Sequence, residues 1–255
     1  MRKMKAEEKQ TIYRLLAAAG SCALGYTPDS FRTTPEFTTD LEPAGPAADG
    51  RGQPEPRLPP QTMDEIIRRI GRCTKCRLAR TRTNVVPGTG ALSPLVMVIG
   101  EGPGADEDRM GLPFVGKAGQ LLDRMLASIS LSRDTNCYIA NIVKCRPPQN
   151  RDPLPDEQDA CLPFLEAQIE ILRPGMILCM GRIAAQRLLS TGDPVGKLRG
   201  SFRSYGGIPL LVTYHPSALL RNESLKRPAW EDLKMFRSRL LEISPGYDSG
   251  RTEAR

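Results

Sequence analysis

The stretch VMVIGEGPGADED, Val96–Asp108, decides the fold that this sequence predicts. It opens with an apolar run that no polar residue interrupts, and it ends abruptly in glycines, a proline and carboxylates. A short, unbroken apolar run of this kind is typical of a strand that is buried on both faces of a sheet. We therefore expect a buried strand at 95–99, followed by a loop at one edge of that sheet.

Three further apolar runs follow, and helical patterns separate them. The expected strands are 95–99, 137–143, 176–180 and 209–214, and the expected helices are 118–129, 156–172, 182–189 and 228–241. This alternation predicts an α/β fold of three α/β/α layers with a central, mostly parallel four-stranded sheet. Ligands of such sheets bind beyond the carboxyl ends of the strands. The loop after the first strand is therefore expected at the binding edge.

The loop that begins at Gly100 has the wrong chemistry for a nucleotide phosphate. It lacks both G-x-G-x-x-G in the right frame and the G-K-S/T of a P-loop. Its carboxylates would repel a phosphate group; they are Glu101, Asp106, Glu107 and Asp108. The loop favours a polar, neutral ligand rich in carbonyl groups. An acidic turn at the start of a helix, stabilised by the helix dipole, is the alternative reading.

The composition limits the class of protein. The chain has 255 residues, 40% of them hydrophobic, which is enough for one sizeable core. Lysine and arginine outnumber aspartate and glutamate by 36 to 29, a net charge of +7 that favours a polyanionic partner without identifying it. No run of about 18 apolar residues occurs, so we expect no membrane span.

The ends of the chain differ in character from its centre. We expect a short amphipathic segment at 1–25, with a signal peptide as the alternative, and a flexible linker rich in Pro, Gly and Thr at 26–60. The folded domain is expected at 61–243, and a disordered tail at 244–255. A helix should open the domain, because Thr62 and Glu65 have the spacing of a capping box.

Seven cysteines, an odd number scattered over the chain, do not form the pattern of a secreted disulfide framework. Cys73 and Cys76 form a C-x2-C pair directly after the expected first helix, and Cys145 and Cys161 follow far downstream. Four thiolates suit zinc or an iron–sulfur cluster, and the split second pair modestly favours the cluster. The alternative is that Cys145 and Cys161 are small core residues.

Two polar residues stand at strand ends of the same sheet edge. His215, the only histidine, follows the last expected strand, and Asn141 lies near the end of the second. A lone histidine is most often a packed or solvated residue. Its coincidence with Asn141 and with the glycine-rich loop favours a functional site instead.

Four longer motifs, taken together, resemble family 4 of the uracil-DNA glycosylase superfamily, the bacterial and archaeal enzymes that carry a 4Fe-4S cluster. They occur in the family's order over about 62–241. The motifs are CTKCRLARTRTNVVPGTG (73–90), GEGPGADEDRMGLPFVGKAGQLLDRML (100–126), NIVKCRPPQNRDPLPDEQDAC (141–161) and HPSALLR (215–221).

The resemblance implies a role for each matching residue. The cluster ligands would be Cys73, Cys76, Cys145 and Cys161. Gly100, Glu101 and Gly102 would meet the target base and the attacked sugar carbon, and Glu107 would crowd C5 of the base and exclude thymine. The base would stack on Phe114, pair with Asn141 and present its O2 to His215.

The resemblance also implies how the bond is cleaved. His215 would stabilise the negative charge that develops on uracil, and the carboxylate of Glu101 would stabilise the positive sugar. The best-known glycosylases place an aspartate directly after the position of Glu101. This chain has Gly102 there, which leaves the group that activates water open.

DNA contacts are expected from two segments, RPPQNR (146–151) and LLRNESLKR (219–227), which would meet phosphates and the groove. Leu219 or Leu220, followed by Arg221, would be the wedge that fills the vacated base stack. The alternative for these leucines is an ordinary apolar start of a helix.

The implied function is excision of uracil from single- and double-stranded DNA in base excision repair. The protein would be a monomer in the bacterial or archaeal cytosol, at the nucleoid. Rival interpretations are a non-enzymatic iron–sulfur redox module and a zinc-stabilised DNA-binding protein. A related family that is trapped covalently on uracil-DNA through a histidine after the asparagine strand is disfavoured, because CRPPQNRDP (145–153) contains no histidine.

Overall fold

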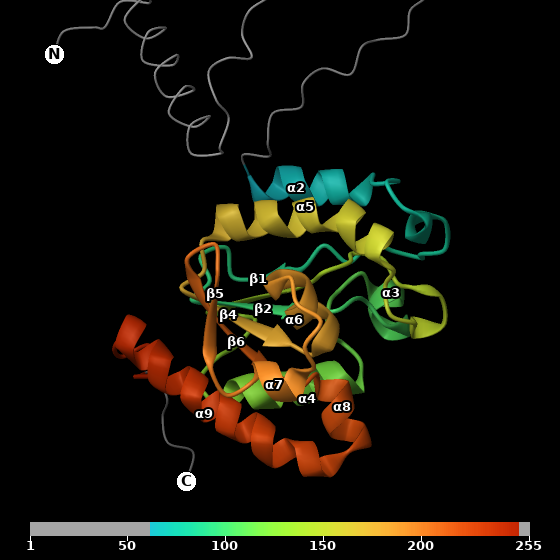
Figure 1. The fold of residues 1–255 in the computed structure, drawn as a ribbon. Coiled ribbons are helices and arrows are strands. Elements are labelled where there is room, and N and C mark those ends of the chain that lie inside the picture. The colour runs from blue at the N-terminus through green and yellow to red at the C-terminus, as the bar shows by residue number, and fades with distance from the viewer. Residues whose placement is uncertain (1–61, 250–255) are drawn as a thin grey trace, which may run out of the picture. The chain divides into compact units, whose positions relative to one another are not determined.

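A computed structural model of the protein describes residues 62–249 (Figure 1). Within this range one sheet holds six strands in the order β1-β3-β2-β4-β6-β5. The strands are β1 (Thr89–Gly90), β2 (Val96–Gly100), β3 (Cys137–Asn141), β4 (Met176–Met180), β5 (Phe202–Tyr205) and β6 (Ile208–Thr213). The helices are α2 (Met63–Gly71), α3 (Ala105–Met110), α4 (Lys117–Ala127), α5 (Pro155–Leu172), α6 (Arg182–Leu189), α7 (Val195–Leu198), α8 (Pro216–Arg221) and α9 (Lys226–Ile243).

The expected α/β fold with a mostly parallel sheet is confirmed, but the expected number of four strands is wrong. The four expected strands β3, β2, β4 and β6 are parallel neighbours, and β1 and β5 add an antiparallel strand at each edge. β5 joins β6 through Gly206 and Gly207, which both have positive φ. Such a two-residue turn is the usual connection of a tight hairpin.

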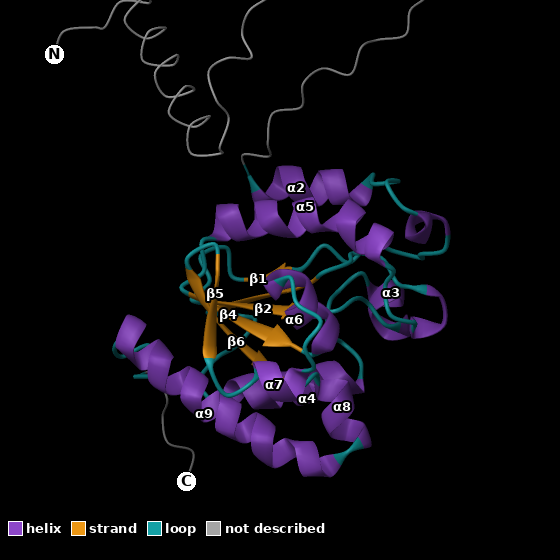
Figure 2. Ribbon diagram, in the orientation of Figure 1, coloured by secondary structure: helices purple, strands orange, loops and turns teal. Residues whose placement is uncertain are grey.

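The two faces of the sheet bury separate cores, which explains the unbroken apolar strands. Along β2, Met97 and Ile99 point into one core, and Val96 and Val98 point into the other. Helices α2, α5 and α6 cover the first core, and α4, α8 and α9 cover the second (Figure 2). Both faces are therefore dry, and the three-layer arrangement follows.

Helix α2 opens the described domain as its sequence predicts. The Thr62 side chain accepts a hydrogen bond from the backbone N–H of Glu65, at 3.2 Å, and Ile66 and Ile70 are buried. α2 lies alongside α5 in Figure 1, and the two helices are in contact. This pair brings the chain after α2, with Cys73 and Cys76, close to Cys161 of α5.

The ends of the domain differ from expectation on the carboxyl side. Residues 244–249, expected in the disordered tail, contact the domain: the Tyr247 hydroxyl donates to the Ile129 carbonyl at 2.8 Å, and Asp248 pairs with Arg237 at 2.6 Å. The domain's contacts therefore extend past residue 243. The expected amphipathic segment, the linker and the tail beyond 249 lie outside the described residues.

None of the helices in the described part of the chain is long and apolar enough to cross a membrane.

Candidate active site

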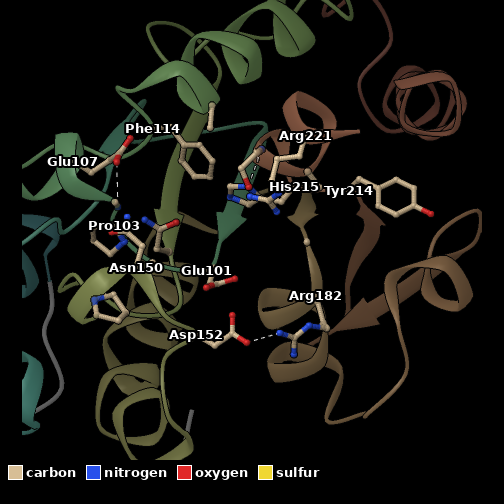
Figure 3. Close-up of a pocket in the computed structure, with 18 of the residues that line it drawn as sticks. Glu101, Pro103, Glu107, Phe114, Asn150, Asp152, Arg182, Tyr214, His215 and Arg221 are labelled. Carbon is tan, nitrogen blue, oxygen red and sulfur yellow. Dashed lines mark hydrogen bonds and ion pairs between the residues drawn. The ribbon is translucent and has the colours of Figure 1, made fainter. Parts of the chain in front are cut away.

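A cavity of about 640 Å³ opens at the carboxyl edge of the parallel strands (Figure 3). Its lining comes from loops that follow β2, β3, β4 and β6, as the sheet-edge rule predicts. The predicted site residues that it brings together are Glu101, Gly102, Glu107, Phe114, Asn141, His215 and Arg221. The residues Phe114, Asn141 and His215, far apart in the chain, thus face one cavity.

Gly100 leaves room for the side chains of Asn141 and Phe114 to approach each other. It pairs with Asn141 across the β2–β3 ladder. A Cβ atom at Gly100 would lie 2.5 Å from Asn141 Oδ1 and 2.6 Å from Phe114 Cζ. Gly181, with φ +89°, approaches His215 in the same way, and a Cβ there would lie 2.9 Å from the His215 Cβ. Glycine is therefore needed at both positions to let the side chains converge.

Asn141 presents an unpaired polar atom to the cavity. Its side chain is 1% exposed, and its Oδ1 has no hydrogen-bond partner. A buried amide oxygen left unpaired costs free energy, on the order of 1–3 kcal/mol. A side-chain amide can accept and donate side by side. The position is consequently suited to a ligand that has a donor next to an acceptor.

His215 is held as a neutral ring with a defined tautomer. It caps α8, and its Nδ1 accepts a hydrogen bond from the backbone N–H of Ser217 at 3.2 Å. Burial and the nearby Arg221 lower the pKa of His215 to about 4. Because Nδ1 accepts, the proton of the neutral ring is on Nε2. His215 is therefore a neutral donor, and its ring stacks against Phe114 at a centroid distance of 5.4 Å.

Glu101 follows β2 and has an unusual acidity. Burial, with a smaller contribution from Asp152, raises the pKa of Glu101 to about 7, although Arg182 and Arg221 oppose the rise. Asp152 is itself paired with Arg182 at 2.5 Å, and Figure 3 shows the pair at the cavity wall near Glu101. The carboxyl group of Glu101 thus titrates near neutral pH.

Glu107 lines the cavity, but its carboxylate accepts hydrogen bonds from three backbone N–H groups. Its Oε2 accepts from the N–H of Gly104 at 3.1 Å, and its Oε1 accepts from the N–H groups of Val115 at 2.9 Å and Gly116 at 3.0 Å. Glu107 therefore ties the loop after β2 to the loop that carries Phe114.

The four predicted metal ligands line a second, small cavity between α2 and α5. The cysteines in its lining are Cys73, Cys76, Cys145 and Cys161. The Arg82 guanidinium donates to Cys145 Sγ at 3.2 Å, and the Lys144 backbone N–H donates to Cys161 Sγ at 3.3 Å. Such N–H groups stabilise negative charge on thiolate sulfur.

The donor set fits a metal group bound by thiolates. Cys73, Cys76, Cys145 and Cys161 share one cavity, and two of them accept N–H groups. Four cysteine thiolates are the ligands of an iron–sulfur cluster and also of a structural zinc ion.

Comparison with known proteins identifies the family. The model of the uracil DNA glycosylase superfamily matches residues 87–234. A type-4 uracil-DNA glycosylase of Archaeoglobus fulgidus is 42% identical over 182 residues, which is 68% of this chain and 91% of the relative. The type-4 enzyme of Thermotoga maritima is 44% identical over 183 residues, 70% of this chain and 94% of the relative.

The chain belongs to the uracil-DNA glycosylase superfamily. Within it, the chain belongs with the type-4 enzymes. A type-5 uracil-DNA glycosylase of Pyrobaculum aerophilum is 30% identical over 191 residues, 61% of this chain and 83% of the relative.

The two leucines of the predicted DNA wedge differ in exposure. Leu219 is 2% exposed and packs in the core between the sheet and α4, α8 and α9, so it does not reach solvent. The adjacent Leu220 is 47% exposed, and Arg221 lines the cavity. Neighbouring residues on a helix point in different directions, so only Leu220 of the two predicted leucines has an exposed side chain.

Several cavity residues of this glycosylase fold were not singled out in the sequence. They are Asp152, Arg182, Tyr214 and Ser217. Arg182 and Tyr214 lie directly beyond β4 and β6, so the sheet-edge rule, applied to every strand, would have found them. Asp152 lies in the loop between β3 and α5. No local sequence pattern indicates that this loop folds back to Arg182.

Proposed function

We propose that this cavity removes uracil from DNA by hydrolysing its N-glycosidic bond and leaves an abasic site, as in base excision repair. The observation that carries the proposal is the unpaired amide of Asn141, held 1% exposed beside Phe114 and His215. The family to which the chain belongs and the activity named for its type-4 relatives support the same reaction.

Uracil matches the polar groups of the cavity. Its N3–H would donate to Asn141 Oδ1, and its adjacent O4 would accept from the amide nitrogen, so the unpaired atom would gain its partner. The flat base would stack on Phe114. Gly102 offers no side chain and allows the backbone to approach the base closely. The finer assignment that Glu107 keeps out a C5 methyl group belongs to the same proposal.

Cleavage breaks the bond between C1′ of deoxyribose and N1 of uracil. The bonding electron pair leaves with uracil, water supplies the hydroxyl group to C1′, and the remaining proton of that water ends on the uracil anion, which leaves as neutral uracil. The Nε2–H of neutral His215 would donate to O2, where the negative charge gathers. The ionised Glu101 would face the positive sugar and help orient water, and Asp152 lies near enough to affect its charge.

The target base must leave a duplex to reach this cavity. Flipping costs a few kcal/mol, which stacking on Phe114, pairing with Asn141 and phosphate contacts would offset. Arg221 lines the cavity, Leu220 is exposed beside it, and the chain carries a net charge of +7. We propose that Leu220 fills the gap in the stack and that single- and double-stranded DNA are both substrates of a monomer.

We assign the four cavity-lining cysteines to a 4Fe-4S cluster. When bound, the cluster supplies four covalent links that join the segment after α2 to α5 and to the segment after β3, and it brings redox-active iron. The arrangement of Cys145 only four residues after Asn141 supports a structural role near the base-binding strand. We further propose a bacterial or archaeal cytosolic location, close to the nucleoid.

The proposal is tested with an end-labelled oligonucleotide that holds one uracil. The purified protein should release uracil without added divalent metal, and alkali should then cut the strand at that position. Asn141→Ala should lose this activity and keep the cluster absorbance near about 400 nm. An intact strand after treatment with cluster-loaded wild-type protein would contradict the proposal and favour the non-enzymatic iron–sulfur module.

A further inference from the structure

Phe114, the proposed stacking surface, has a backbone conformation that its side chain disfavours. Its φ is +53°, in the left-handed region, although it carries a bulky aromatic side chain. Residues other than glycine, asparagine and aspartate rarely adopt this conformation, and it persists only where the surroundings enforce it. Phe114 is also 6% exposed and contacts His215. The neighbours that impose its conformation are therefore part of the site.

Arg133 fixes the carbonyl side of this turn. Its Nη1 donates to the Pro113 carbonyl at 2.9 Å, and its Nη2 donates to the Phe114 carbonyl at 2.9 Å. Asp123 of α4 orients the same guanidinium through Nε at 3.0 Å and Nη2 at 2.8 Å. Arg133 does not line the cavity, and its side chain is only 18% exposed.

Glu107 fixes the amide side of the same turn. It accepts hydrogen bonds from Val115 and Gly116, the two residues that follow Phe114. α4 closes the remaining direction, because a Cβ atom at Gly119 would lie 1.9 Å from the Phe114 carbonyl oxygen. The peptide groups before and after Phe114 are thus held by a cation on one side and an anion on the other.

We infer that Arg133, oriented by Asp123, is a positioning residue that holds Phe114 in its left-handed conformation and so keeps the ring in place for the flipped base. The inference rests on the proposed role of Phe114 in uracil excision. The guanidinium suits this task because its planar fork reaches two successive carbonyl groups at once. A lysine at this position would offer a point charge without that geometry.

The first test is single-turnover excision from a uracil-containing single strand by Arg133→Met. We expect the rate constant to fall about 5- to 100-fold, the range that corresponds to releasing one strained residue. Arg133→Lys should recover part of the rate. The matched control is Arg109→Met, which removes the exposed ion pair with Asp106 in α3 and should keep the wild-type rate.

A double-mutant cycle with Phe114→Ala separates positioning from a general loss of structure. If Arg133 acts through the ring, Arg133→Met should have little further effect once Phe114 is alanine. Asp123→Asn provides a milder variant if Arg133→Met folds poorly, and the thermal midpoint and the absorbance near about 400 nm check each protein. Additive losses, or a wild-type rate for Arg133→Met and Asp123→Asn, would overturn the inference. Failure of the wild-type protein to release uracil would instead overturn the proposed function.

Discussion

Two cavities differ in whether their polar atoms have hydrogen-bond partners within the protein. One is the cysteine cavity, lined by Cys73, Cys76, Cys145 and Cys161, and the other is the strand-edge cavity at the carboxyl ends of the parallel strands. In the first, Cys145 and Cys161 already accept N–H groups from Arg82 and Lys144. In the second, Asn141 Oδ1 is buried without a partner. Polar atoms that are satisfied within the protein belong to its permanent structure, whereas an unpaired one is suited to a ligand that comes and goes. The difference separates the proposed cofactor site from the proposed substrate site.

One short segment connects the two cavities. Asn141 ends β3, and Cys145 follows four residues later. Between them, Lys144 is 1% exposed, and its ammonium donates to the Asn141 carbonyl at 2.9 Å and to Gln168 Oε1 at 2.7 Å. Gln168 lies on α5, the helix that also carries Cys161. Asn141, the proposed base-reading residue, and the cysteine cavity therefore share a continuous set of hydrogen bonds.

The largest expected effect comes from removing one proposed cluster ligand. Cys145→Ala should lose the absorbance near about 400 nm and most of the soluble, folded protein, because a metal site contributes its binding free energy to folding. Cys179→Ala, a buried cysteine of β4 outside the cavity, is the matched control and should keep its colour. A coloured, soluble Cys145→Ala protein would remove this cysteine from the ligand set.

The next effect concerns the donor at the strand-edge cavity. His215→Ala should reduce the single-turnover excision rate by about 10²- to 10³-fold, the loss found when one preorganised donor to a developing anion is removed. Its cluster absorbance and affinity for DNA should stay near those of the wild type. If the substitution removed the cluster absorbance, the two cavities would not be independent sites, and the comparison between them would fail.

The pH dependence tests the assignment of Glu101. Its pKa is raised to about 7, so the carboxyl group is neutral below that pH and ionised above it. If the carboxylate is the active form, kcat/KM should rise about tenfold per pH unit up to about pH 7 and then level off. His215, with a pKa of about 4, stays neutral throughout and adds no further limb. Glu101→Gln should flatten the profile, and a wild-type rate that falls as pH rises from 5 to 7 would contradict the assignment.

The smallest expected effect comes from the connection between the cavities. Lys144→Met should destabilise the protein by about 1–3 kcal/mol, because it leaves the Asn141 carbonyl and the Gln168 side chain with an unmade bond. We expect excision to slow by about tenfold as Asn141 loses its support. The control is Lys197→Met, at an exposed lysine of α7. A lower thermal midpoint with an unchanged excision rate would show that Lys144 contributes to stability and not to excision.

The sequence predicted the centre of the fold better than its edges. The four parallel strands are continuous apolar runs, a pattern that double burial imposes, and they lie within about two residues of the expected positions. β1 has only two residues, one of them Gly90, and it is a strand only because β3 pairs with it. β5 is half exposed, so no apolar run marks it, and it was not predicted. The glycine pair before β6 is the sequence signal that could have revealed the turn.

In the site, too, the residues marked by a local sequence pattern were predictable, and those placed by distant parts of the chain were not. Asn141 and His215 were predictable because each stands where a strand ends. Leu219 and Leu220 were not distinguishable, since their burial depends on which face of α8 meets α4. The pair of Asp152 and Arg182 depends on a loop that folds back over a long distance in the chain. The left-handed backbone of Phe114 likewise depends on residues far from it, above all Arg133.

Gly100 has a consequence for attempts to redesign this enzyme. The amide of Asn141 and the ring of Phe114 both occupy the space that any larger residue would need at this position. A library that randomises Gly100 should consequently yield inactive proteins, whatever base is offered. Selections for activity on another base would do better to vary the outer wall, where the loop residue Asp152 is exposed and Arg182 reaches it from α6.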